Sequence, residues 1–130
     1  MQIAPIRFAV EYGDRLNDID QLVNGMNEVL QDTNTPGCVY GDRSGFHILA
    51  GQKDFHPEDV DQQIAQAQPE RLTAGMGALT QPFRAAMLLE GIDLSGASGR
   101  PSAVHTETDV EHTLGAFART LDRFRRWEVW

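Results

Sequence analysis

Several short patterns in this chain contain residue types that could do chemistry. His105-Thr106-Glu107 matches the H-x-E element of zinc deaminases, in which the histidine binds zinc and the glutamate transfers protons. Such a site also needs a P-C-x-x-C pair, whereas Cys38 is the only cysteine of the chain. The four histidines show neither the HExxH spacing nor another paired-ligand spacing. The sequence therefore predicts no metal site.

The serines, glycines and acidic residues form no recognised catalytic motif. Ser44 and Ser98 lack the G-x-S-x-G flanks that would expose a nucleophile at a sharp turn. The glycine pairs near positions 75 and 96 lack a dinucleotide fingerprint or a P-loop lysine, so we interpret them as turns. Aspartate and glutamate are spread over predicted helix surfaces without an obvious acid–base pair. From the residues alone we predict no catalytic and no cofactor-binding residue.

Composition narrows the class of protein and its partners. A chain of 130 residues is expected to form one domain, spanning 1–130. Its net charge of −8 argues against nucleic acid or an anionic membrane as a partner. No apolar run approaches the ~20 residues of a membrane span. A single cysteine fits a reducing compartment, so we expect a cytoplasmic protein. The arginines between 119 and 126 are interpreted as a solvated helix face, with a phosphate site as the alternative.

Hydrophobic periodicity then predicts the elements of the first half. Residues 14–32 have a helical apolar face, with Asp14 as a cap and turn formers at 34–37. Residues 38–41 and 45–50 are predicted to be two short strands around a polar turn. In the second strand, Phe46 and Ile48 share one face, and His47 and Leu49 share the other.

The second half alternates weaker and stronger signals. Residues 51–70 are predicted to be a loop with at most a short helix near 57–66, where Pro57 suits the first turn. Residues 72–89 have a helical composition that glycines and Pro82 interrupt, and 83–90 is the secure part, followed by Gly91. We expect strands at 92–94 and 101–104, with a flexible turn at 95–100 between them.

The last predicted element is an amphipathic helix that Thr106 caps. Its apolar stripe has helical spacing and comprises Val110, Leu114, Phe117, Leu121 and Phe124. The order of elements predicts an α+β fold: a two-layer domain with a short antiparallel or mixed sheet, covered by helices on one face.

Two stretches resemble a known family when taken together. PGCVYGDRSGFHILAG (36–51) is similar to the segment after the first helix of the C-terminal small domain in class III, pyridoxal-phosphate (PLP)-dependent aminotransferases. The stretch 85–121, from AAMLLEGIDL to AFARTL, resembles the closing segment of that domain. Its A-x-H-T motif before the last helix is typical of the glutamate-1-semialdehyde aminomutase-like branch. The resemblance covers about 14–126 and keeps the order of the elements.

The resemblance implies a fold type I small domain that packs on a large cofactor domain. In such enzymes the Schiff-base lysine and the aspartate at the pyridinium nitrogen belong to the large domain. Lys53, the only lysine here, matches no Schiff-base position and is expected to be a solvated surface residue. The full-length family thus implies PLP, whereas this chain alone is expected to bind no cofactor. Its expected partner is the large PLP-binding domain or a second copy in a homodimer.

One departure bears on the substrate. True aminomutases have an acidic residue before the last strand, and the matching segment 95–100 contains no carboxylate. Ser98 and Arg100 are the candidates for the edge of a substrate site, with simple turn and surface roles as the alternative. Because the Schiff-base lysine belongs to the large domain, we expect a small-domain fragment that is inactive alone. The alternative is a stand-alone interaction or regulatory domain that uses the same fold.

Overall fold

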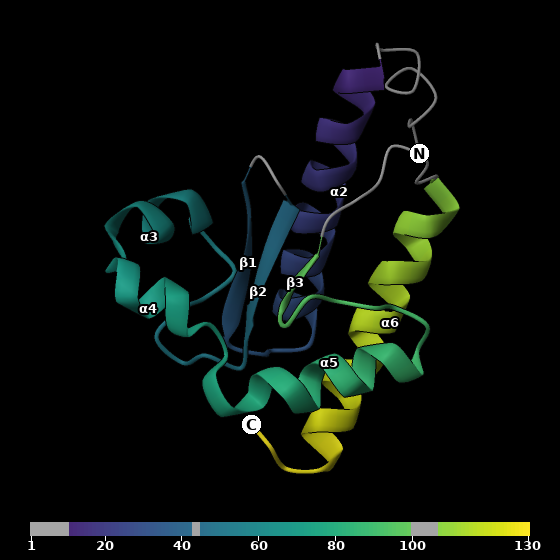
Figure 1. Cartoon of the computed structure of the whole chain (residues 1–130). Helices are drawn as coiled ribbons and strands as arrows, with labels where there is room; N and C mark the ends of the chain where they lie inside the picture. The colour runs from purple at the N-terminus through teal and green to yellow at the C-terminus, as the bar shows by residue number, and fades with distance from the viewer. Residues whose placement is uncertain (1–10, 43–44, 100–106) are drawn as a thin grey trace.

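The computed structural model describes residues 11–42, 45–99 and 107–130. A three-stranded antiparallel sheet has the order β1-β2-β3, with strands Gly37–Asp42, Gly45–Ala50 and Ser98–Gly99. The long helices α2 (Glu11–Asp32) and α6 (Glu107–Arg126) lie side by side, and α5 (Thr80–Leu89) passes below α2 and crosses the lower half of α6 (Figure 1). The predicted α+β class is confirmed, and the sheet is of the antiparallel kind.

The main core lies between one face of the sheet and these three helices. Alternation along β1 and β2 turns Val39, Ile48 and Phe46 toward α2, because successive strand residues point to opposite faces. The predicted stripe of α6 supplies Phe117, and α5 supplies Phe83. The fully buried large side chains of this core are Phe83, Phe117, Phe124, Met26, Leu30, Ile48, Met87, Leu121 and Val39.

A smaller apolar cluster covers part of the opposite face of the sheet. Cys38 and Leu49, which face each other across β1 and β2, pack there against Phe55. Helices α3 (Val60–Gln66) and α4 (Pro69–Ala74) lie beside β1 and close this cluster (Figure 1). The sequence predicts a helical layer on one face of the sheet. The structure has that layer and, in addition, the two short helices α3 and α4 against the opposite face.

Several predicted boundaries are correct for the reasons that predicted them. Helix α2 ends at Asp32, where Asn34 takes a left-handed conformation and the amide of Thr35 bonds the carbonyl of Leu30. Helix α5 ends in the same way, because Gly91 has a φ of +88° and the amide of Ile92 bonds the carbonyl of Met87. A left-handed residue after each helix lets the last carbonyls find donors.

Other boundaries differ from the prediction. Helix α2 begins at Glu11, so Asp14 lies inside it and is not its cap. Pro57 precedes the first turn of α3, which begins at Val60, while Pro69 occupies the first position of α4. The expected helix 72–89 is divided at Gly75 and continues through the short 3-10 turn η1 (Gly77–Leu79) into α5. Pro82 is tolerated because it lies in the first turn of α5.

The third strand is not where the sequence predicts it. Residues 92–94 form no strand, because the side chain of Leu94 enters the main core and its backbone has no ladder partner among the described residues. The strand is instead Ser98–Gly99, in the segment predicted to be a flexible turn. The predicted strand 101–104, the Thr106 cap, His105 and Arg100 lie outside the described residues.

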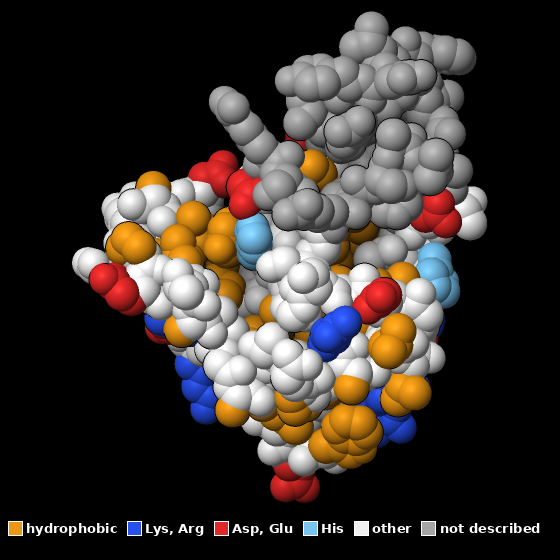
Figure 2. Space-filling view, in the orientation of Figure 1, with side chains coloured by type: hydrophobic (Ala, Val, Ile, Leu, Met, Phe, Trp, Pro, Cys, Tyr) orange, Lys and Arg blue, Asp and Glu red, His pale blue; other side chains and the backbone are white. Residues whose placement is uncertain are grey.

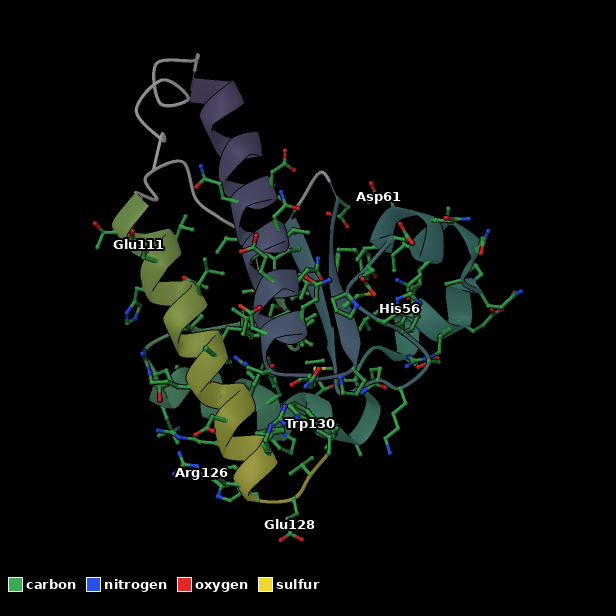
Figure 3. All side chains as sticks on the ribbon, turned by 180° about the vertical axis from the view of Figure 1, so that it is seen from behind. His56, Asp61, Glu111, Arg126, Glu128 and Trp130 are labelled. Carbon is green, nitrogen blue, oxygen red and sulfur yellow. The ribbon has the colours of Figure 1, made fainter. Side chains whose placement is uncertain are left out.

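The C-terminal segment folds back on the domain. The ring of Trp130 lies 5.0 Å from that of Phe124, and its side chain sits against Gly51, where a Cβ atom would collide with it. Figure 3 shows Trp130 turned inward beside α6, whereas Glu128 points away from the molecule. Trp127, in contrast, is 61% exposed.

Candidate functional site

Polar side chains gather on the sheet face that the main core does not use. Tyr40 and Asp42 alternate along β1 on this face, and the antiparallel register places His47 of β2 opposite Tyr40. Ser98 of β3 lies opposite His47 on the other side. We call Tyr40, Asp42, His47 and Ser98 the sheet-face cluster. Its four members come from three strands, so the sheet pairing alone brings them together.

One continuous hydrogen-bonded line runs through this cluster. The Nε2 atom of His47 lies 2.6 Å from Oδ2 of Asp42, and its Nδ1 atom lies 2.8 Å from Oγ of Ser98. With Asp42 ionised, Nε2 carries the proton and donates it to the carboxylate, which leaves Nδ1 to accept the hydroxyl proton of Ser98. The line therefore joins a hydroxyl, an imidazole and a carboxylate in that order.

Neighbouring groups hold the line in place. The rings of Tyr40 and His47 stack with centroids 4.9 Å apart. The other carboxylate oxygen of Asp42 accepts a bond from the amide of Gly45 at 3.0 Å, which fixes the carboxylate across the β1–β2 turn. Burial, with added repulsion from Asp42, raises the pKa of Tyr40 above its usual value. Tyr40 is thus a neutral phenol that braces the imidazole.

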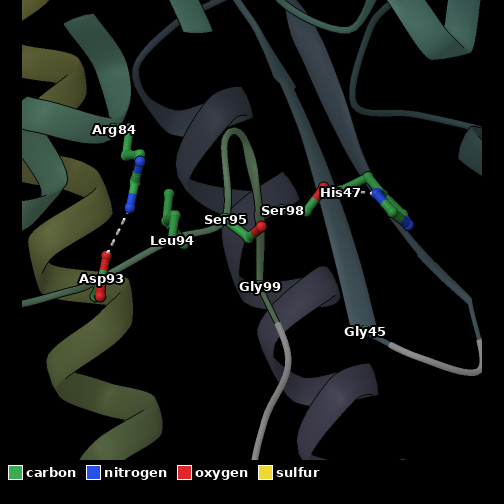
Figure 4. Close-up of a pocket in the computed structure, with 8 residues that line it drawn as sticks. All are labelled: Gly45, His47, Arg84, Asp93, Leu94, Ser95, Ser98 and Gly99. Carbon is green, nitrogen blue, oxygen red and sulfur yellow. Dashed lines mark hydrogen bonds and ion pairs between the residues drawn. The ribbon is translucent and has the colours of Figure 1, made fainter. Parts of the chain in front are cut away.

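The line borders two cavities of the surface. One has a volume of about 680 Å³ and is lined by His47, Ser98, Ser95, Arg84 and other residues. Figure 4 shows Ser95 and Ser98 on a tight turn between His47 on one side and the Arg84–Asp93 pair on the other. The second cavity, of about 420 Å³, lies on the side of α4 and is also lined by Tyr40, His47 and Ser98.

The arginine cluster of the last helix is used for structure. Arg119 and Arg123 of α6 bind the carboxylate of Glu90 at 2.7 and 2.9 Å, and the Arg119 bond lowers the pKa of Glu90. Arg125 donates to the carbonyl of Thr33 and to the hydroxyl of Thr35, so it caps the end of α2. These contacts account for the cluster without a phosphate site, although Arg119, Arg123 and Arg125 make ion pairs and a helix cap where the sequence predicts a solvated helix face.

Ser98 is the predicted substrate-edge residue that the structure places in this cluster, and Arg100 lies outside the described residues. Sequence reasoning missed His47, Asp42 and Tyr40. The pairing of the two predicted strands contained the signal for His47 and Tyr40, because a hairpin closed near residues 42–45 brings them opposite each other. The described part of the chain holds no group of three His, Cys, Asp or Glu residues placed to share a metal ion. None of its helices has the length and apolarity of a bilayer-crossing segment.

No family model and no curated protein matches the chain. Among solved structures, the chain is similar to an omega-transaminase from Sphaerobacter thermophilus, with 28% sequence identity and a TM-score of 0.63. The match covers 88% of this chain and 24% of the transaminase chain, so the chain spans about a quarter of that protein's length. The likeness supports a class III aminotransferase-like domain, and the fold is consistent with the C-terminal domain of a transaminase.

Proposed function

We propose that the chain is the C-terminal small domain of a PLP-dependent class III aminotransferase, of the glutamate-1-semialdehyde aminomutase-like branch. Its role would be to complete a catalytic cleft beside a large PLP-binding domain, in a cytoplasmic homodimer. The observation that carries the proposal is the transaminase match, which covers 88% of this chain but 24% of that enzyme. The assignment to the branch depends on the A-x-H-T motif in the sequence alone.

The described residues do not fit a PLP site. PLP serves its enzymes as an electron sink and is held through a lysine. Lys53, the only lysine of the chain, is exposed on the turn after β2 and lies outside both cavities at the sheet-face cluster. We therefore assign the cofactor and its chemistry to a separate large domain, and the chain alone should not transfer amino groups.

The first test is a titration of the purified chain with PLP. We expect the spectrum of free PLP to persist without a stoichiometric internal aldimine band, because no enclosed lysine is available. The variant Lys53→Ala should give the same spectrum. A stoichiometric band that Lys53→Ala removes would overturn the proposal that this chain lacks a cofactor site.

A complementation assay tests the positive half of the proposal. A transaminase large domain expressed without its own small domain would be mixed with this chain, and amine transfer would be measured. Activity that needs both parts supports the small-domain role. Failure of the two parts to associate in sedimentation would count against it.

A second candidate function, a stand-alone interaction domain, is favoured by one observation. Leu88 and Leu89 of α5 are 55% and 75% exposed, and Trp127, which follows α6, is 61% exposed. Figure 2 shows hydrophobic side chains gathered at the lower end of the molecule in that view, in the region of α5. Contiguous apolar patches mark contact surfaces, whereas apolar side chains that are exposed singly are normal on a soluble protein.

Sedimentation velocity over a range of concentrations tests whether the apolar patch, meaning Leu88, Leu89 and Trp127, mediates self-association. We expect a reversible dimer, and we expect the double variant Leu89→Ser/Trp127→Ser to shift the population toward monomer. The matched control is Thr108→Ser, an exposed change on α6 away from the patch. A monomer at all concentrations would count against self-association as the use of these residues.

A further inference from the structure

The hydrogen-bonded line from Ser98 through His47 to Asp42 has no role in the proposed small-domain function. It contains a nucleophile, a base within hydrogen-bond reach, and a third group that orients the base. This is the arrangement that activates a serine hydroxyl in unrelated folds, and it is recognised by geometry and not by sequence position. Here Nδ1 of His47 is the basic nitrogen. It can serve as well as Nε2 would, because the Asp42 carboxylate accepts the N–H of Nε2 and so leaves the lone pair on Nδ1.

We propose that Ser98 is an acyl-accepting nucleophile and that the chain hydrolyses small esters in the 680 Å³ cavity beside it. The substrate class is a short-chain carboxylic ester with a good leaving group. The activity needs neither PLP nor a large domain, so it does not depend on the proposed function.

The proposed ester hydrolysis consumes only the ester and one water molecule. Oγ of Ser98 attacks the ester carbonyl carbon while Nδ1 of His47 takes the hydroxyl proton. The carbon–oxygen bond to the alcohol breaks, and the imidazolium returns that proton to the leaving alkoxide, which leaves an acyl-Ser98 ester. Water then attacks this ester with His47 as base, which releases the carboxylic acid and restores the serine hydroxyl. Asp42 stabilises the imidazolium in both halves.

The surroundings favour Ser98 over other nucleophiles of the described chain. Burial raises the pKa of the Cys38 thiol to about 12, so it is neither ionised nor accessible at the pH of an assay. Ser95 lines the same cavity but has no histidine partner among its described hydrogen bonds. Arg84 lines the same cavity but is paired there with Asp93 at 3.5 Å, so the hydrogen-bonded residues Ser98, His47 and Asp42 carry the proposal.

The test is hydrolysis of p-nitrophenyl acetate by the full chain, with peptide mapping to locate the acetyl group. We expect turnover above an equal concentration of free imidazole and acetylation at Ser98. Since general base catalysis contributes about 10²–10⁴-fold, Ser98→Ala and His47→Gln should each lower the rate about 100-fold. Asp42→Asn should lower it at least as much, because an amide N–H donated to Nε2 holds the imidazole in the tautomer whose Nδ1 is already protonated and cannot act as a base.

Ser95→Ala is the matched control, since it removes a serine hydroxyl from the same cavity without touching the line. His56→Gln controls for hydrolysis by an exposed imidazole. Circular dichroism checks that each variant folds, and labelling of Ser98 by a fluorophosphonate gives a second readout on the unmodified chain. The proposal is overturned if Ser98→Ala keeps the original rate, or if neither the acetyl group nor the fluorophosphonate is found on Ser98.

Discussion

Replacing Phe83 by alanine should lower the free energy of unfolding by about 3–5 kcal/mol, the usual cost of removing a buried phenylalanine side chain. Phe83 has no exposed surface and lies where α5 meets α6. Its ring makes edge contacts with Phe117 and Phe124, at centroid distances of 6.1 and 5.8 Å. The substitution would remove both contacts and leave a cavity, because close-packed neighbours relax only in part. Urea denaturation followed by circular dichroism measures the change.

Leu89→Ala is the matched control for this experiment. It removes a large apolar side chain from the same helix, but Leu89 is 75% exposed, so its loss should change stability by no more than about 0.5 kcal/mol. If Phe83→Ala proves too unstable to purify, Phe83→Leu keeps part of the volume and should give a smaller, measurable loss. Equal effects of Phe83→Ala and Leu89→Ala would contradict the description of the α5–α6 core.

The elements that the sequence predicts well are those whose signal is local. The stripe through Phe117 and Leu121 repeats at helical spacing, and both side chains are fully buried in α6. Gly91 ends α5 because glycine adopts a left-handed conformation without a steric cost. The hairpin of β1 and β2 follows from alternation and a polar turn, so half of the sheet-face cluster was within reach of sequence reasoning.

The third strand depends on contacts that no local pattern encodes. Strand β3 pairs with the edge of β2 that faces away from β1, where backbone N–H and C=O groups are unpaired by β1. The amide of Ile48 there donates to the carbonyl of Ala97 at 2.8 Å. Gly99 is required by a close approach, since a Cβ atom there would lie 2.4 Å from the ring of Phe46. The segment has little strand propensity, so tertiary context decides its structure. Ser98 therefore meets His47 across 51 residues of sequence, which is why the sequence could not predict the line.

The second large effect is expected at Asn27, a buried polar residue of α2. The backbone N–H and C=O of Val39 point away from β2, to an edge of β1 where the described residues form no further strand. The side-chain amide of Asn27 takes the place of that strand: its Nδ2 donates to the carbonyl of Val39, and its Oδ1 accepts from the Val39 amide, each at 2.9 Å. Asn27→Ala would leave both backbone groups buried without partners. At about 1–3 kcal/mol for each of the two unsatisfied groups, the free energy of unfolding should fall by about 2–6 kcal/mol.

Asn24→Ala provides the comparison, because Asn24 lies on the same helix one turn earlier and is exposed. Its effect should stay within about 0.5 kcal/mol. Amide hydrogen exchange gives a site-specific readout: Asn27→Ala should speed exchange of the Val39 amide more than that of the neighbouring Ile48 amide, which keeps its bond to Ala97. A Val39 amide that remains protected in Asn27→Ala would mean that another group satisfies this edge. Because β1 also carries Tyr40 and Asp42, loss of the Asn27 bonds should loosen the sheet-face cluster and lower the ester hydrolysis proposed for Ser98.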